Sequence, residues 1–295
     1  MRPLRLIALL AVLPSAFAWV ETVKPQKEIT QTRQNPEIKV DTSQPGMASR
    51  LFLDSRKLIS SQPTEADLKK AYELMLQAAE LNYPRAMLHV ATFYSDGMGV
   101  EQNFGEAMRW YRRVAESVKP ELVNVAQNNI GLFYYRGQGV TKDRRESLKW
   151  LQCAVDNGNT KAINNLKFVR GHILTLEAME IMDSQPSKAD EKKAFELLLE
   201  GAEGNYPWAM LYTASNYQRG RGVQQNFLEA MRWYLEVAEL NHKTAKVAQN
   251  NIGIMYYRGE GLPQDHAEAI KWLQRAVDNG HPKAGKALKH IRAQN

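Results

Sequence analysis

Apolar residues recur along most of the chain at the three-to-four-residue spacing of an amphipathic helix. In the stretch that begins at Phe104, for example, Ala107, Trp110 and Val114 fall on one helical face, and mostly polar residues occupy the opposite face. No stretch shows the alternation of β-branched and polar residues that is typical of a strand. The pattern therefore predicts an all-α protein.

Long segments of the sequence occur twice. SQPTEADLKKAYELMLQAAELNYPRAM at 61–87 returns at 184–210 as SQPSKADEKKAFELLLEGAEGNYPWAM, an offset of 123 residues. AQNNIGLFYYRGQGV at 126–140 returns at 248–262 as AQNNIGIMYYRGEGL, an offset of 122. A catalytic site is rarely needed twice in one chain, so we interpret these words as parts of a duplicated structural unit.

A shorter period lies inside each half. Trp110 and Trp150 are 40 residues apart, and Trp233 and Trp272 are 39 apart. Six such units, three in each half, account for the repeats, and a period of this length indicates a solenoid or a similar array. The spacing predicts that these four tryptophans lie in the core. Trp208 lies outside this register, and the sequence leaves open whether it is a contact residue or packs locally.

Glycines mark two kinds of position in each unit. GxG stretches, such as the one that begins at Gly97, fall between paired helices, where they suit a left-handed C-cap and a tight reversal. A phosphate-binding function for them would require a strand before the loop, and none is expected. Gly131 and Gly253 lie inside predicted helices, where glycine costs about 1 kcal/mol relative to alanine. They indicate that a partner helix approaches closely there.

The repeated segments resemble those of a known family. A-Q-N-N-I-G-x-x-Y-Y-R-G-x-G-V, followed by A-x-x-W-x-x-x-A-V-x-N-G, closely resembles the Sel1-like repeat, a relative of the tetratricopeptide repeat. The resemblance covers 50–293 and is weaker in the first and fourth units, where SSQPTEAD and DSQPSKAD replace the glycine loop. It implies a right-handed α-solenoid of about six helix-turn-helix repeats, duplicated as two three-repeat halves. It also implies a concave face that holds partner proteins.

The N-terminal sequence predicts export. MRPLRLIALLAVLPSAFA has the basic start, short apolar stretch and small-residue end of a signal peptide, so we expect cleavage near Ala18 and a periplasmic or secreted mature protein. No later stretch is apolar for long enough to predict stable insertion in a membrane. The expected organisation is a signal peptide at 1–18, a flexible tail at 19–49, a first solenoid half at 50–170, and a second half with a C-terminal capping helix at 171–295.

Charge and histidine spacing limit the ligands and reactions that the sequence predicts. Loss of Arg2 and Arg5 lowers the net charge from +7 to +5, and no block of like charges predicts a nucleic-acid partner. None of the six histidines is paired at the i, i+4 spacing of a zinc site, and no G-x-S-x-G motif is present. The sequence therefore predicts no catalytic residue, no metal and no cofactor.

The single cysteine, Cys153, occupies a slot that is polar in the sister units. The residues there are Gln77, Arg113, Glu200, Glu236 and Arg275. Because the helices of a repeat array pack alike, the register predicts an exposed thiol, although a free cysteine is more often buried. An exposed thiol in an oxidising compartment can join two copies of the chain through an intermolecular disulfide.

The sequence favours an exported, non-enzymatic protein–protein interaction module, either a scaffold or an adaptor. A structural part of an envelope or exopolysaccharide assembly complex is an alternative, and an enzyme that acts on a cell-envelope glycan is a weaker one. By the resemblance, the partner is expected on one face of the first helix of each unit. The positions are His89, Thr92, Ser95, Asn129, Leu132, Tyr135, Arg136, Tyr212, Ser215, Gln218, Arg219, Asn251, Ile254, Tyr257 and Arg258. The asparagines have a second interpretation, in which they satisfy neighbouring backbone groups.

Overall fold

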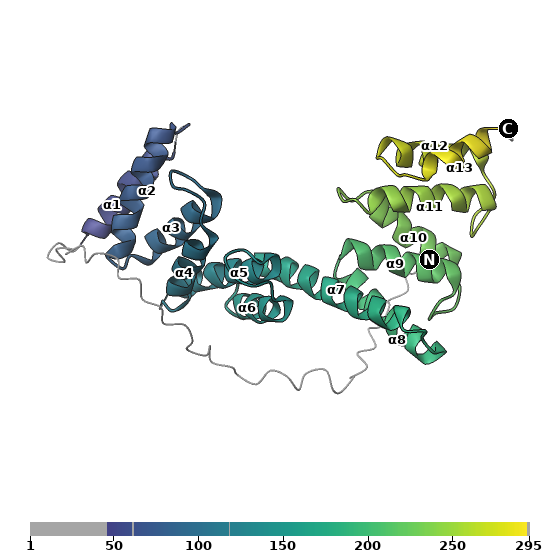
Figure 1. The fold of residues 1–295 in the computed structure, drawn as a ribbon, viewed down its shortest axis with the longest axis horizontal. Coiled ribbons are helices and arrows are strands. Elements are labelled where there is room, and N and C mark those ends of the chain that lie inside the picture. The colour runs from purple at the N-terminus through teal and green to yellow at the C-terminus, as the bar shows by residue number, and fades with distance from the viewer. Residues whose placement is uncertain (1–45, 61, 118, 294–295) are drawn as a thin grey trace, which may run out of the picture. The chain divides into compact units, whose positions relative to one another are not determined.

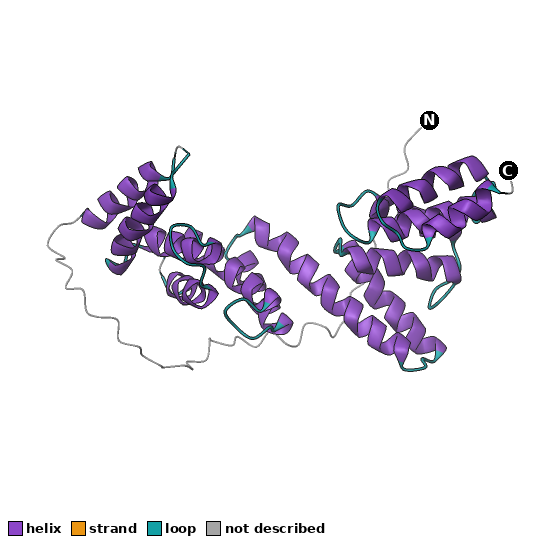
Figure 2. Cartoon of the chain, turned by 45° about the horizontal axis from the view of Figure 1, so that its top comes forward, coloured by secondary structure: helices purple, strands orange, loops and turns teal. Residues whose placement is uncertain are grey.

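The computed structural model describes residues 46–60, 62–117 and 119–293. This part of the chain forms helices and connecting loops without strands (Figures 1 and 2). Its thirteen helices are α1 (Met47–Leu58), α2 (Glu65–Glu80), α3 (Pro84–Asp96), α4 (Phe104–Ala115), α5 (Pro120–Arg136), α6 (Arg144–Asp156), α7 (Thr160–Asp183), α8 (Lys188–Glu203), α9 (Pro207–Arg219), α10 (Phe227–Ala238), α11 (Ala245–Arg258), α12 (His266–Asp278) and α13 (Ala284–Arg292). The all-α prediction is confirmed.

The helices pack in pairs that follow the order of the sequence. α1 packs on α2, α3 on α4, α5 on α6, α7 on α8, α9 on α10 and α11 on α12, and each pair also contacts the next. First helices of consecutive units meet as well, because α3 contacts α5, α5 contacts α7, and α7 contacts α9. The final helix, α13, buries Ala284, Leu288 and Ile291 and exposes mostly polar residues. The chain is therefore an α-solenoid of six hairpins with a covering helix at its C-terminal end.

Two of the expected domain boundaries do not coincide with the ends of helices. The expected signal peptide and most of the expected tail, 19–49, lie outside the described residues. α1 begins at Met47, so the last three residues of the expected tail are helical. The expected boundary between the halves, after residue 170, lies inside α7, which is 24 residues long.

The glycine loops have two structural roles. α3 is capped by Gly97, whose φ of +70° is the left-handed conformation that the sequence predicts. Gly99, two residues later, packs on the first turn of α2, where a Cβ atom would lie 2.2 Å from the carbonyl oxygen of Leu68. The equivalent contacts in later units are Gly139 on Phe104, Gly222 on Glu191 and Gly261 on Phe227. Each loop therefore locks its unit to the preceding one.

The first and fourth units use a different connection. α2 and α8 have no preceding glycine loop and instead begin with capping boxes, in which Thr64 pairs with Asp67 and Ser187 pairs with Asp190. In each box the side chain accepts a hydrogen bond from the backbone of the aspartate, and the carboxylate accepts one from the backbone of the cap. This explains why SSQPTEAD and DSQPSKAD depart from the pattern of the other units.

The predicted core is only partly correct. Trp110 and Trp233 are buried, but Trp150 and Trp272 are only partly buried, so the prediction is wrong for these two. In α6 and α12 the residue after the tryptophan, Leu151 or Leu273, is the fully buried one. Each leucine lies against a helix glycine of its partner, so it takes the centre of the contact and displaces the tryptophan to the edge. The predicted close approach at these glycines is confirmed.

Candidate functional site

The residues expected to meet a partner share one face of α3, α5, α9 and α11, which we call the first-helix face. It consists of the fifteen positions predicted above. Three of them, Arg136, Arg219 and Arg258, are exposed, and the other twelve are partly exposed. The opposite face of the same helices is buried, as Val90 in α3 and Ile130 in α5 show. The first-helix face is therefore accessible, and its use as a binding surface stays a prediction.

In the last units, side chains of the first-helix face are joined across helices. The Gln218 amide donates to the Glu260 carboxylate at 2.7 Å and accepts from the Tyr234 hydroxyl at 3.0 Å. Arg258 lies 3.3 Å from the same carboxylate of Glu260. Two of the predicted residues are thus held together by an acid from the α11–α12 loop, which the sequence did not single out.

The residues of the repeated AQNN segments have two roles, one in packing and one on the surface. Asn157, in the turn after α6, donates to Gln127 at 2.9 Å, and Asn279 donates to Gln249 at the same distance after α12. The glutamine therefore ties each first helix to the end of its own hairpin. Asn251, on the first-helix face, accepts from the side-chain amide of Asn250 at 3.3 Å.

An aromatic cluster lies where α5, α7 and the start of α9 meet. The Tyr135 hydroxyl is 2.8 Å from Nδ1 of His172, and the His172 ring stacks on Tyr206 with centroids 5.2 Å apart. Phe168 contacts the rings of both tyrosines. Burial lowers the pKa of His172, and Arg144 lowers it further; burial also raises the pKa of Tyr206 to about 12. Only Tyr135 was predicted, because Phe168 and His172 lie on α7, in one of the two units where the repeat pattern is weaker.

Trp208 combines the two roles that the sequence left open. Its ring stacks on Tyr212 at 6.0 Å with an interplanar angle of 28°, and the Lys243 ammonium lies 5.5 Å from its centroid. The side chain is partly buried in this packing and still presents surface.

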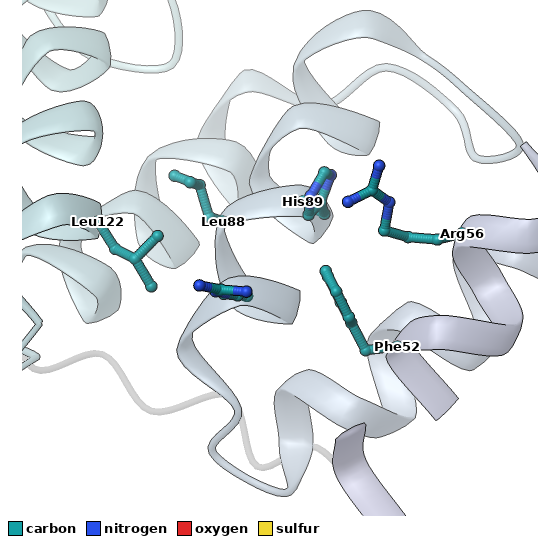
Figure 3. Close-up of a pocket in the computed structure, with 6 residues that line it drawn as sticks. Phe52, Arg56, Leu88, His89 and Leu122 are labelled. Carbon is teal, nitrogen blue, oxygen red and sulfur yellow. The ribbon is translucent and has the colours of Figure 1, made fainter. Parts of the chain in front are cut away.

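A pocket of about 300 Å³ opens on the first-helix face at the N-terminal end of the array (Figure 3). α1 contributes Phe52 and Arg56, α3 contributes Leu88 and His89 together with Arg85, and α5 contributes Leu122. The His89 ring lies 5.5 Å from the ring of Phe52, and Figure 3 shows Arg56 pointing toward His89.

Electrostatics distinguishes this pocket from a larger one. Burial lowers the pKa of His89, and the nearby Arg56 guanidinium lowers it further. The imidazole is therefore mostly neutral at pH 7. A hollow of about 620 Å³ beside α8 has side chains of both signs, and its Glu191 carboxylate pairs with Arg221 at 2.8 Å. The smaller pocket is lined by two cations and no acid.

Sequence reasoning found one residue of this pocket, His89. Phe52, Arg56 and Leu122 were missed because they come from the first helices of two other units, and no motif links them to His89. Arg85 and Leu88 lie on the same helix as His89, but outside the positions that the resemblance implies. A usable signal was present, since Arg85 and His89 are positions at which the two halves of the duplication differ.

The described part of the chain offers no metal site and no membrane span beside these pockets. Within it, no three side chains of histidine, cysteine, aspartate or glutamate are grouped so that they could hold a metal ion. No described helix has the length and apolarity needed to cross a bilayer. Cys153 is exposed, as predicted, and the pKa of its thiol is raised by partial burial and by Asp156.

Comparison with known proteins agrees with this architecture. The model of the Sel1 repeat matches the chain six times, over more than half of its length, at 60–83, 84–117, 124–159, 179–206, 209–242 and 246–281. The chain belongs to the Sel1 repeat family. Repeats of this kind commonly serve as protein-interaction scaffolds.

Two solved structures illustrate the similarity. A protective antigen of uropathogenic Escherichia coli strains, which displays an SLR fold, is 26% identical with a TM-score of 0.59; the match covers 84% of this chain and 50% of the antigen. A Sel1 repeat protein from Oxalobacter formigenes is 30% identical with a TM-score of 0.48, and the match covers 81% of this chain and 64% of that protein. This chain thus spans about half to two thirds of their lengths. No curated protein matches it.

Proposed function

We propose that this chain is an exported, non-enzymatic scaffold or adaptor that binds a protein partner along the first-helix face. The observation that carries the proposal is the separation of roles on the first helices. Their apolar side is consumed by packing, whereas all fifteen predicted positions on the other side keep exposed surface. Membership of a family whose repeats commonly serve as interaction scaffolds supports the same function.

The chemistry of the face suits an extended peptide. Side-chain amides such as those of Asn129 and Asn251 can both donate to and accept from a peptide backbone. Arginines at the ends of the first helices, for example Arg136 and Arg219, can pair with carboxylates through two parallel hydrogen bonds. Partner recognition by backbone hydrogen bonds and charge would require no reactive group in the chain.

Capture of partners from envelope extract tests the proposal. Asn129→Ala combined with Asn251→Ala is expected to leave helicity intact and to weaken capture by the mature chain. The matched control is Gln152→Ala combined with Gln274→Ala, because these residues occupy equivalent positions of α6 and α12, outside the first-helix face, where Gln152 is exposed and Gln274 is partly exposed. Equal capture by the wild type and by a folded Asn129/Asn251 variant would contradict the assignment of this face.

Export and self-association are further parts of the proposal. The first eighteen residues support export, and Edman sequencing of the mature protein is expected to begin just after Ala18. An N-terminus that retains Met1 would contradict it. The exposure of Cys153 supports the formation of a disulfide between two copies in an oxidising compartment.

A further inference from the structure

We propose that the pocket between α1, α3 and α5 receives the C-terminus of a peptide partner, with its carboxylate on Arg56 and Arg85 and an apolar last side chain against Phe52, Leu88 and Leu122. The inference rests on the proposed function, and it names the part of the partner that this end of the first-helix face recognises.

The charge of the pocket calls for an anion. Arg56 and Arg85 are exposed side chains that border it, and neither takes part in an ion pair among the described residues. A guanidinium matches the geometry of a carboxylate and binds it through charge-assisted hydrogen bonds. His89, held neutral by its surroundings, can add one further hydrogen bond without competing for the charge.

The walls of the pocket call for an apolar group beside that anion. Phe52 of α1 and Leu122 of α5 are buried, and both line a space of about 300 Å³. This volume is at the small end for ligand sites, so it suits one residue and not a whole ligand. A C-terminal residue carries its carboxylate and its side chain on the same carbon atom, so its carboxylate can meet the arginines while its side chain contacts the apolar residues. A glutamate or aspartate inside a peptide does not.

The duplication supplies an internal comparison. The start of α3 reads PRAMLH and the equivalent start of α9 reads PWAMLY, so two of the six positions differ. Those two, Arg85 and His89, both line the pocket, whereas Ala86 and Met87 are buried and are kept as Ala209 and Met210.

The second half fills the equivalent place with aromatic rings. Trp208 stands where Arg85 stands in the first half, and it stacks on Tyr212, the counterpart of His89. Met179 replaces Arg56 at the same offset. Repeat packing therefore does not require the two arginines, since the second half folds into the same helices without them.

The experiment follows the histidine-ring NMR signals of the full mature chain, with His89 assigned from a His89→Gln variant. The probes are N-acetyl-leucine, its neutral analogue N-acetyl-leucinamide, and N-acetylglycine, which keeps the carboxylate and lacks the apolar side chain. N-acetyl-leucine is expected to raise the pKa of His89, because a bound carboxylate favours the imidazolium. The amide is expected to leave the pKa unchanged, and N-acetylglycine to bind more weakly.

Two variants test the arginines against a matched loss of charge. Arg56→Gln and Arg85→Gln are each expected to weaken N-acetyl-leucine binding at least about tenfold, because each removes a charge-assisted pair. Arg145→Gln, on α6, loses the same charge at an exposed position outside both the pocket and the first-helix face, and it is expected to bind like the wild type. Both tested arginines are exposed, so their loss leaves the core intact.

Several results would overturn the inference. One is binding of the amide as tight as that of the acid; another is a loss of binding in Arg145→Gln equal to that in Arg85→Gln. A His89 pKa already above its ordinary value without any probe, and insensitive to all three, would show that a carboxylate of the chain itself occupies the pocket. If none of the probes binds while the Asn129/Asn251 variant still loses partner capture, the pocket is wrong and the proposed function stands.

Discussion

Gly131 of α5 lies so close to Leu151 of α6 that a Cβ atom at the glycine would stand 2.7 Å from Cγ of the leucine. Gly253 and Leu273 repeat the same relationship in α11 and α12, with the same distance of 2.7 Å. Real Cβ contacts are longer than this, so each glycine sets how closely the two helices of its hairpin approach.

We expect Gly131→Ala to destabilise the protein. Alanine improves helix propensity by about 1 kcal/mol, but overpacking against Leu151 costs about 1–3 kcal/mol, and the clash should prevail. Gly285→Ala is the control, because a Cβ there meets its nearest neighbour at 4.0 Å. Urea unfolding should show a lower midpoint for Gly131→Ala and an unchanged or higher one for Gly285→Ala. A gain in stability at both positions would show that the hairpin is looser than described.

Leu151→Ala should cost more stability than Trp150→Ala. The leucine is fully buried, and its truncation leaves a cavity worth about 2–5 kcal/mol. The tryptophan is partly exposed at the edge of the contact, so we expect about 2 kcal/mol for its removal, below the range for a buried aromatic. The free energies of unfolding of the two variants, measured side by side, decide the order. The reverse order would restore the tryptophan to the core.

Stability should fall on mild acidification. The pKa values of His89, His172, His242 and His281 are all lowered in the fold, mainly by burial. Below the ordinary value of 6.5 the unfolded chain therefore binds more protons than the folded one, and the stabilisation present above this pH is progressively lost. We expect a lower Tm near pH 5.5 than near pH 7.5. His89→Gln combined with His172→Gln should reduce the difference, and a Tm that rises on acidification would contradict the argument.

Cys153 should react with a thiol reagent in the folded protein. It is exposed, but partial burial and Asp156 raise its pKa, so less thiolate is present than in an unfolded chain and native labelling should be slower. Labelling by mass spectrometry, with and without denaturant, measures both rates. A thiol that labels only after unfolding would refute the exposure.

A non-reducing gel of the same preparation tests the disulfide between two copies. The expected result is a dimer band that reductant removes and that Cys153→Ser lacks. A wild-type protein that stays monomeric under oxidising conditions would exclude the link, even if the thiol labels readily.

The fold could be predicted from the sequence because the sequence is repetitive. The exposure of Cys153 follows from five sister positions that are all polar, because helices that pack alike expose the same slot. The position of a residue within a unit does not determine how deeply its side chain is buried, however. Trp110 and Trp150 share a register, yet the second is displaced by Leu151 because Gly131 admits the leucine. That displacement depends on contact between two helices, which single-helix periodicity does not contain.

The candidate site was likewise only partly predictable from the sequence. The first-helix face follows from helical geometry, since positions one turn apart share a side. The pocket does not, because Phe52, Arg85 and Leu122 come from three units and meet only when those units are stacked. The aromatic cluster at His172 was hidden for a related reason, since α7 lacks the repeat pattern that would have placed it.

The glycine loops also determine how an array like this one can grow. A unit whose loop carries a glycine such as Gly99 needs the matching helix start of the unit before it, because the loop rests there. The loop that precedes α8 instead closes on itself through Ser187 and Asp190. A block of three units that opens with such a loop therefore does not depend on a glycine contact with the block before it. Duplication in steps of three units, and not of one, is the ancestry that this geometry permits most readily.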